Sequence, residues 1–165
     1  MSNEKKKSVL MVCLGNICRS PIAEAVFIDC LRKRGKEDEW LVDSSAIIGY
    51  HTGKGPDSRA MGALKKYGIT DYKHKARVTS PEDIRQFDYI FGMDDSNIED
   101  LREIEQKVPQ KDRRSKILML GQQDPEGKKE VPDPYYESGS KQFDEVLEQC
   151  VKCCNCFLDT IYNQK

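Results

Sequence analysis

The chain has 165 residues, 27 basic and 28 acidic side chains, a net charge of −1 and 38% hydrophobic residues. This length and composition exclude a disordered chain and suit one compact domain, which we expect over residues 8–165 behind a flexible tail of residues 1–7. The charge excludes a global attraction to nucleic acid, and no apolar run approaches the ~20 residues of a membrane span, so we expect a cytoplasmic protein.

The first predicted strand covers residues 8–14, a nearly continuous apolar run typical of a strand buried on both faces of a parallel sheet. A helix is predicted to follow, because Ser20 can cap it, Pro21 suits its first turn and Gly35 lies just beyond its expected end. Residues 40–44 are predicted as the second strand.

Strands and helices continue to alternate along the rest of the chain. A second helix is predicted to open at residues 56–59 and to end before Gly68, and Ser80 is predicted to cap a short third helix. Further predicted elements are strands over residues 89–93 and 116–120, helices over residues 96–104 and 141–162, and a long exposed loop over residues 121–140. The alternation predicts a single-domain α/β fold, in which a four-stranded parallel sheet has helices on both faces.

Cys13 and Arg19 flank the turn between the first predicted strand and the first predicted helix. Ligands of open parallel sheets bind beyond the carboxyl ends of the strands, where this turn lies. Backbone N–H groups of such a turn and of the helix start can surround an anion, and Arg19 adds a bidentate donor. The pattern predicts a phosphate-binding loop with Cys13 as nucleophile, and the loop residues are Leu14, Gly15, Asn16, Ile17, Cys18 and Ser20.

Several properties of this loop favour catalysis over simple burial of a core cysteine. Gly15 and Asn16 tolerate the left-handed backbone that such a loop demands. Donors that bind phosphate would also stabilise a thiolate on Cys13, and Ser20 can donate a hydrogen bond to the sulfur as it leaves. A cysteine and an arginine at this spacing are common by chance, but the strand before them and the helix after them favour the catalytic interpretation.

A cysteine-based phosphatase also needs an acid that protonates the leaving oxygen. Asp133 is the candidate, because it lies between two prolines in a stiffened turn at the same expected sheet edge as Cys13. Tyr135 and Tyr136 follow it and can wall an aromatic substrate. Without Cys13, an ordinary Asp-Pro turn with solvent-facing tyrosines would be the simpler interpretation.

Two segments carry a resemblance to a known family. Residues 9–25, which include the loop, and residues 133–136, Asp-Pro-Tyr-Tyr, closely resemble the low-molecular-weight protein tyrosine phosphatases, and further matches extend almost end to end. The resemblance implies a phosphotyrosine phosphatase I-like fold, and a monomer, with weak self-association at most, that hydrolyses phosphotyrosine proteins or small aryl phosphates. It implies no metal and no other cofactor.

The resemblance also implies roles for individual residues. Cys13 would form a phosphocysteine, Arg19 would hold the phosphoryl oxygens, and Asp133 would act first as an acid and then as a base for water. The walls of the substrate pocket would be Ile17, Tyr50, Tyr135 and Tyr136. The polar network that supports the loop would be Asn16, Ser20, Ser44 and His74.

Regulation is implied by the same resemblance. Cys18 would form a reversible disulfide with Cys13 under peroxide, and the two tyrosines after Pro134 would be sites of phosphorylation. The chain departs from the family pattern in two segments, which are residues 47–51 and residues 121–131.

Other interpretations concern clusters of acidic residues and cysteines. Asp94 and Asp95 suggest a magnesium site, but Ser96 follows them as a helix cap and favours a helix start. Four late cysteines suggest zinc, but no histidine follows them. On the last predicted helix, Cys150 and Cys154 share the apolar face while Cys153 and Cys156 diverge from it.

Three alternative functions use the same loop. Arsenate reduction needs shuttling cysteines, and none lies between Cys30 and Cys150. Phosphoarginine phosphatases resemble this chain but carry threonine at the position of Ile17. A non-catalytic phosphate-binding or peroxide-sensing module would keep the loop but would not need Asp133.

Overall fold

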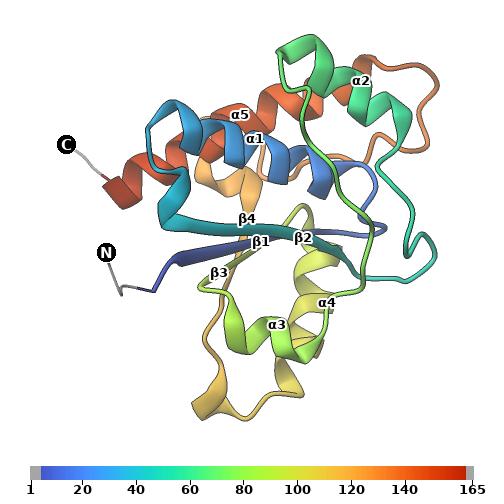
Figure 1. The fold of residues 1–165 in the computed structure, drawn as a ribbon. Coiled ribbons are helices and arrows are strands. Elements are labelled where there is room, and N and C mark those ends of the chain that lie inside the picture. The colour runs from blue at the N-terminus through green and yellow to red at the C-terminus, as the bar shows by residue number, and fades with distance from the viewer. Residues whose placement is uncertain (1–4, 163–165) are drawn as a thin grey trace.

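The computed structural model describes residues 5–162, and these form one four-stranded parallel sheet in the order β2-β1-β3-β4. The predicted α/β fold with helices on both faces of a parallel sheet is confirmed (Figure 1). The strands are β1 (Lys7–Cys13), β2 (Trp40–Ala46), β3 (Tyr89–Gly92) and β4 (Lys116–Met119). The helices are α1 (Arg19–Lys33), α2 (Ser58–Tyr67), α3 (Pro81–Gln86), α4 (Asp95–Gln106) and α5 (Lys141–Tyr162).

Strand β1 lies inside the sheet, between β2 and β3, and its residues Val9 to Val12 are fully buried. Cys13 pairs with Ala46 of β2, and Val12 pairs with Gly92 of β3. The chain therefore leaves all three strands at the same edge of the sheet, with Cys13 at the centre of that edge.

Two layers of helices cover the sheet. Figure 1 shows α1, α2 and α5 on one face and α3 and α4 on the other. The larger core lies under α1 and α5 and includes Phe27, Phe91, Phe143 and Phe157, whereas the smaller core lies under α3 and α4. Across residues 5–162, none of the helices combines the length and the apolar character required of a bilayer-spanning segment.

Helix ends follow local sequence signals, with two exceptions. Gly68 closes α2 in the left-handed region at φ 109°, and Ser80 forms a capping box at the start of α3, as predicted. The predicted cap at Ser96 is wrong, because Asp94 caps α4 by accepting a hydrogen bond from the Asn97 N–H. The predicted cap at Ser20 is also wrong, because this residue lies inside α1 and its hydroxyl is used elsewhere.

The segment 121–140 is not wholly the exposed loop that its composition predicts. It begins in a short 3-10 helix (Leu120–Gln123). Val131 is fully buried, and its N–H donates a hydrogen bond to the Met93 carbonyl. The prediction that Cys153 leaves the apolar face of α5 is wrong as well, because this thiol is only 1% exposed. Of the expected tail, Lys7 belongs to β1, and residues 1–4 lie outside the described part of the chain.

Two shorter 3-10 helices complete the described elements. They are η1 (Glu37–Glu39), just before β2, and η2 (Gln110–Asp112), between α4 and β4. The 3-10 helix Leu120–Gln123, which follows β4, is η3. Because η1 and η2 precede strands, they lie at the amino edge of the sheet, opposite the edge where Cys13 lies.

Candidate active site

The turn between β1 and α1 wraps around the sulfur of Cys13. The Ser20 hydroxyl oxygen lies 3.0 Å from Cys13 Sγ. The backbone N–H groups of Asn16 and Ser20 each donate a hydrogen bond to Sγ, with an N-to-Sγ distance of 3.3 Å. Cys13 is 3% exposed. A sulfur surrounded by donors next to a helix start is suited to carry negative charge, which is the state of a cysteine nucleophile.

Asn16 holds the loop in its unusual shape. Its φ is 60°, in the left-handed region that only a few residue types adopt at small cost. The buried amide nitrogen of Asn16 donates to Ser20 Oγ at 2.7 Å and to Ser44 Oγ at 3.0 Å. Its oxygen lies 2.8 Å from His74 Nε2 and accepts a bond from the Arg77 N–H. Each of these bonds favours the backbone conformation that turns N–H groups toward the sulfur.

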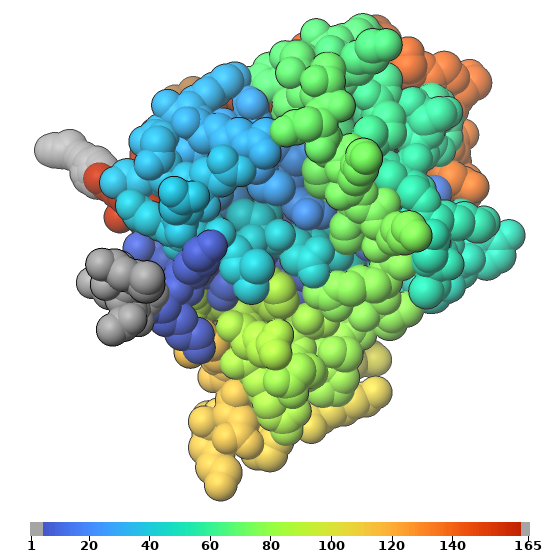
Figure 2. Space-filling view, in the orientation of Figure 1, coloured from blue at the N-terminus to red at the C-terminus, as the bar shows by residue number. Residues whose placement is uncertain are grey.

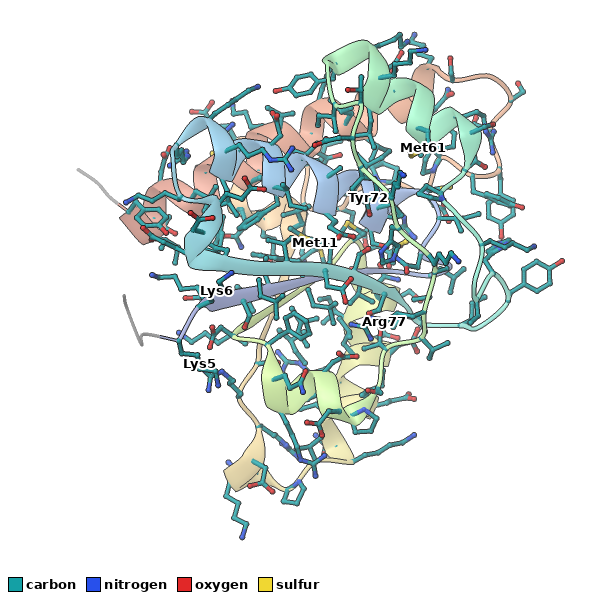
Figure 3. All side chains as sticks on the ribbon, viewed as in Figure 1. Lys5, Lys6, Met11, Met61, Tyr72 and Arg77 are labelled. Carbon is teal, nitrogen blue, oxygen red and sulfur yellow. The ribbon has the colours of Figure 1, made fainter. Side chains whose placement is uncertain are left out.

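A buried carboxyl group lies beneath this network. Glu24, on α1, accepts hydrogen bonds of 2.6 Å from both Ser44 Oγ and the Tyr72 hydroxyl. Burial raises the pKa of the Glu24 carboxyl to about 7, although these two hydrogen bonds act in the opposite direction. Burial also lowers the pKa of His74, whose ring stacks on Tyr72. Figure 3 shows that Tyr72 lies on the segment between α2 and α3.

The raised pKa of Glu24 makes the stability of the fold depend on pH. The folded protein holds this proton more tightly than the unfolded chain, whose value is near 4.5, so the contribution is full below about pH 4.5 and is lost as pH rises through about 7. The loss corresponds to about 3 kcal/mol of unfolding free energy. We expect Glu24→Gln to remove this decline, as measured by urea unfolding from pH 4.5 to pH 8, while Glu148→Gln at an exposed position of α5 retains it. A wild type and a Glu24→Gln variant with parallel profiles would contradict the prediction.

Arg19 lies at the opposite side of the loop and is almost fully buried. Its Nη1 donates to Asp94 Oδ2 at 2.7 Å and to the Val131 carbonyl at 3.0 Å, and its Nη2 lies 3.6 Å from Asp133 Oδ2. Its Nε is buried and has no partner among the described residues. The guanidinium is thus fixed in direction and keeps a donor available for an anion bound over Cys13.

A cavity of about 110 Å³ opens above Cys13. Its floor is the loop, and its walls include Ile48 and the aromatic residues Tyr50, His51 and Tyr135. The complete lining is Cys13, Leu14, Gly15, Ile17, Cys18, Arg19, Ile48, Tyr50, His51, Asp133, Tyr135 and Tyr136. A narrow, aromatic-walled cavity whose lining includes an arginine and a carboxyl group suits a planar ring that carries a phosphate.

Two segments far apart in the sequence form the mouth of this cavity. Tyr50 and His51 follow β2, whereas Tyr135 and Tyr136 follow β4, and Figure 2 shows these segments, coloured teal and orange, on the same side of the molecule. The His51 ring lies 4.7 Å from the Tyr50 ring and 5.9 Å from the Tyr135 ring. A Cβ at Gly15 would lie 2.9 Å from the His51 ring, so this ring would have to shift. The left-handed backbone expected at both Gly15 and Asn16 is found only at Asn16.

The structure brings the residues predicted for the site together. The predicted nucleophile, arginine, acid and pocket tyrosines line the cavity, and Asn16, Ser20, Ser44 and His74 form the network below it. Sequence reasoning assigned no role in the site to Glu24, Tyr72 and Asp94. Ile48 and His51 belong to the segment 47–51, which the sequence marks only as a departure from the family pattern. Among Glu24, Tyr72 and Asp94, only Asp94 has a sequence feature that indicates a place in the site. It follows β3, and the chain leaves parallel strands at the edge of the sheet where Cys13 lies.

The network also contains the one set of side chains in residues 5–162 whose geometry could hold a metal ion, namely Glu24, Asp43 and His74. Glu24 already accepts bonds from Ser44 and Tyr72, and Asp43 is paired with Arg77 at 3.0 Å. These partners explain the cluster as a support of the loop. The prediction that catalysis needs no metal stays a prediction.

Comparisons with known proteins agree over nearly the whole chain. The family described as low molecular weight phosphotyrosine protein phosphatase matches residues 8–165. A protein of that name from Sus scrofa is 46% identical to this chain, and the alignment covers 98% of this chain and 99% of the relative.

Solved structures share the fold as well. The crystal structure of Primo-1 has a TM-score of 0.85 and 44% identity, and the match covers 93% of this chain and 97% of Primo-1. The crystal structure of DARP, drosophila arginine phosphatase, has a TM-score of 0.88 and 32% identity, with 95% of this chain and 99% of that chain covered. The chain is therefore similar to these proteins in both sequence and fold.

Proposed function

The chain belongs to the low molecular weight phosphotyrosine protein phosphatase family and is a phosphate ester hydrolase of the tyrosine phosphatase type, and we propose that it acts through a phosphocysteine on Cys13. The family assignment confirms the resemblance expected from the loop and from the Asp-Pro-Tyr-Tyr segment. The roles of the individual residues form the proposal that follows.

In the first step, the Cys13 thiolate attacks phosphorus, so that an S–P bond forms as the P–O bond to the leaving group breaks. The protonated Asp133 carboxyl gives its proton to the leaving oxygen, because a phenol leaves more readily than a phenolate. Arg19 Nε and the loop N–H groups bind the phosphoryl oxygens as the charge on them shifts.

In the second step, water attacks the phosphocysteine. The Asp133 carboxylate takes a proton from this water, a P–O bond forms, and the S–P bond breaks to release inorganic phosphate. Ser20 Oγ, 3.0 Å from Sγ, donates to the thiolate that is restored. No electrons are transferred, and the enzyme returns to its starting protonation state.

The observation that carries this proposal is the set of three donors around Cys13 Sγ at the base of a cavity that also holds Arg19 and Asp133. A non-catalytic phosphate-binding module has no use for a carboxyl group beside the arginine. Arsenate reduction is not supported either, because Cys150 is fully buried within the larger core and cannot serve as a mobile relay.

The proposed substrates are phosphotyrosine proteins and small aryl phosphates. Tyr50 and Tyr135 provide flat walls for a ring, and Ile17 provides an apolar contact near the floor of the cavity. An aliphatic phosphoarginine would gain less from these walls. We further propose that the enzyme is a cytoplasmic monomer with weak self-association at most, and that peroxide links Cys13 to Cys18 reversibly.

Trapping the intermediate tests the proposal. We expect hydrolysis of an aryl phosphate at about pH 5.5 to continue in excess EDTA, and acid quenching during turnover to trap one phosphoryl group on the peptide that contains Cys13. Mass spectrometry of the quenched enzyme locates the group. A phosphoryl group on another residue, or activity that EDTA removes and a metal restores, would show that the chemistry is different.

A further inference from the structure

The segment that carries Asp133 is anchored at two points, one on each side of the carboxyl group. On the amino-terminal side, the buried Val131 donates its N–H to the Met93 carbonyl, and its own carbonyl accepts a bond from Arg19. On the carboxyl-terminal side, the contacts are made by Arg59, near the start of α2. The anchor at Val131 involves Arg19, which the proposed mechanism already uses, whereas Arg59 takes part in neither step of that mechanism.

Arg59 makes two side-chain hydrogen bonds to this segment and two to Asp57. Its Nη1 donates to the Glu137 carbonyl at 2.8 Å, and its Nη2 donates to the Tyr135 carbonyl at 3.1 Å. The guanidinium carbon lies 4.5 Å from the centre of the Phe143 ring and 5.9 Å from the centre of the Tyr135 ring. A planar fork of donors fixed on an aromatic face defines the position of two carbonyl groups more tightly than a lysine would.

Asp57 connects Arg59 to the phosphate-binding loop. Its carboxylate accepts bonds from Arg59 Nε at 3.0 Å and from Arg59 Nη2 at 3.1 Å, and it also caps α2 through the Arg59 N–H. Its own backbone N–H donates to the Ile17 carbonyl at 2.8 Å. A continuous chain of hydrogen bonds thus runs from the loop through Asp57 and Arg59 to the carbonyl two residues after Asp133.

We propose that Arg59 is a positioning residue for the general acid, holding the segment of Asp133 at a fixed distance from the phosphate loop. This inference rests on the proposed role of Asp133. Arg59 does not line the catalytic cavity, so its effect must pass through the segment that it clamps. Proton transfer depends steeply on distance, since a misplacement of about 1 Å can cost roughly 100-fold in rate.

The test compares substrates whose leaving groups need the acid to different degrees. Arg59→Met keeps an apolar stem against Phe143 and removes the donors. We expect kcat/KM for phenyl phosphate to fall about 10-fold or more and that for p-nitrophenyl phosphate, whose leaving group needs little protonation, to change less than about 3-fold. Inhibition by inorganic phosphate should stay within about 2-fold, since Cys13 and Arg19 remain in place. Arg32→Met, which removes an exposed arginine on α1 paired with Glu37, is the control and should leave kcat/KM unchanged for both substrates.

A double-mutant cycle separates this proposal from the proposed mechanism. In an Asp133→Asn background, Arg59→Met should have less than about a 2-fold effect on either substrate, because the group that it positions is gone. Equal slowing of both substrates, or the same loss in both backgrounds, would overturn the positioning role. If Asp133→Asn alone spared phenyl phosphate, the assignment of the acid would be wrong instead. Thermal unfolding shows whether each variant is folded. If Arg59→Met is unfolded, Arg59→Lys replaces it, because lysine keeps the charge but not the planar fork of donors, and kcat/KM for phenyl phosphate should then fall by an intermediate amount.

Discussion

Replacing Cys13 with serine is expected to lower kcat for an aryl phosphate by at least about 10⁴-fold while the fold and the binding of phosphate remain intact. A hydroxyl group is close to a thiol in size, so the donors from Asn16 and Ser20 can still surround it. Those donors stabilise a thiolate but cannot ionise an alcohol, and none of the described groups that hydrogen-bond Cys13 Sγ is a base. Steady-state rates and inorganic-phosphate binding measured on the same preparation check the prediction.

The matched control is Cys156→Ser on α5. This cysteine is half-buried, lies outside the cavity and should be replaceable without loss of activity. Residual turnover above about 1% in Cys13→Ser, with the control unaffected, would mean that another group attacks phosphorus. A loss of phosphate binding together with activity would mean that Cys13 holds the loop in shape.

The fold and the floor of the site could be predicted from local patterns. The fully buried β1, a turn with Gly15 and Asn16, and the start of α1 are each dictated by neighbouring residues. Cys13 is the last residue of β1, so the fold class alone predicts that it lies beyond the carboxyl ends of the strands, where ligands bind. The family resemblance then added the pocket residues after β2, which no periodicity indicates.

The missed residues depend on contacts that sequence separation hides. Glu24 has the spacing of an ordinary helix residue, and its burial follows only from the way in which Tyr72 and Ser44 close over it. Asp94 was interpreted through its neighbours in sequence, although its carboxylate both caps α4 and binds Arg19. Such polar networks couple side chains from three or more segments, so no single segment carries their signal.

The second large effect concerns the acid. Asp133→Asn is expected to lower kcat/KM for phenyl phosphate by about 10² to 10⁴-fold, and that for p-nitrophenyl phosphate far less, because the better leaving group departs without a proton. The substituted amide oxygen can still accept the bond that the Tyr135 N–H now makes to Asp133 Oδ1 at 3.0 Å, so the turn keeps its shape.

Asp124→Asn is a closely matched control for this substitution. Asp124 lies in the same connection between β4 and α5, and its Oδ1 accepts a 3.0 Å bond from the N–H two residues further on, as Asp133 does. It lies outside the catalytic cavity, so its replacement should leave kcat/KM for both substrates unchanged. Equal losses in the two variants would trace the effect to the flexibility of the connection, whereas a loss confined to Asp133→Asn, and to poor leaving groups, follows only from a proton delivered by this carboxyl group.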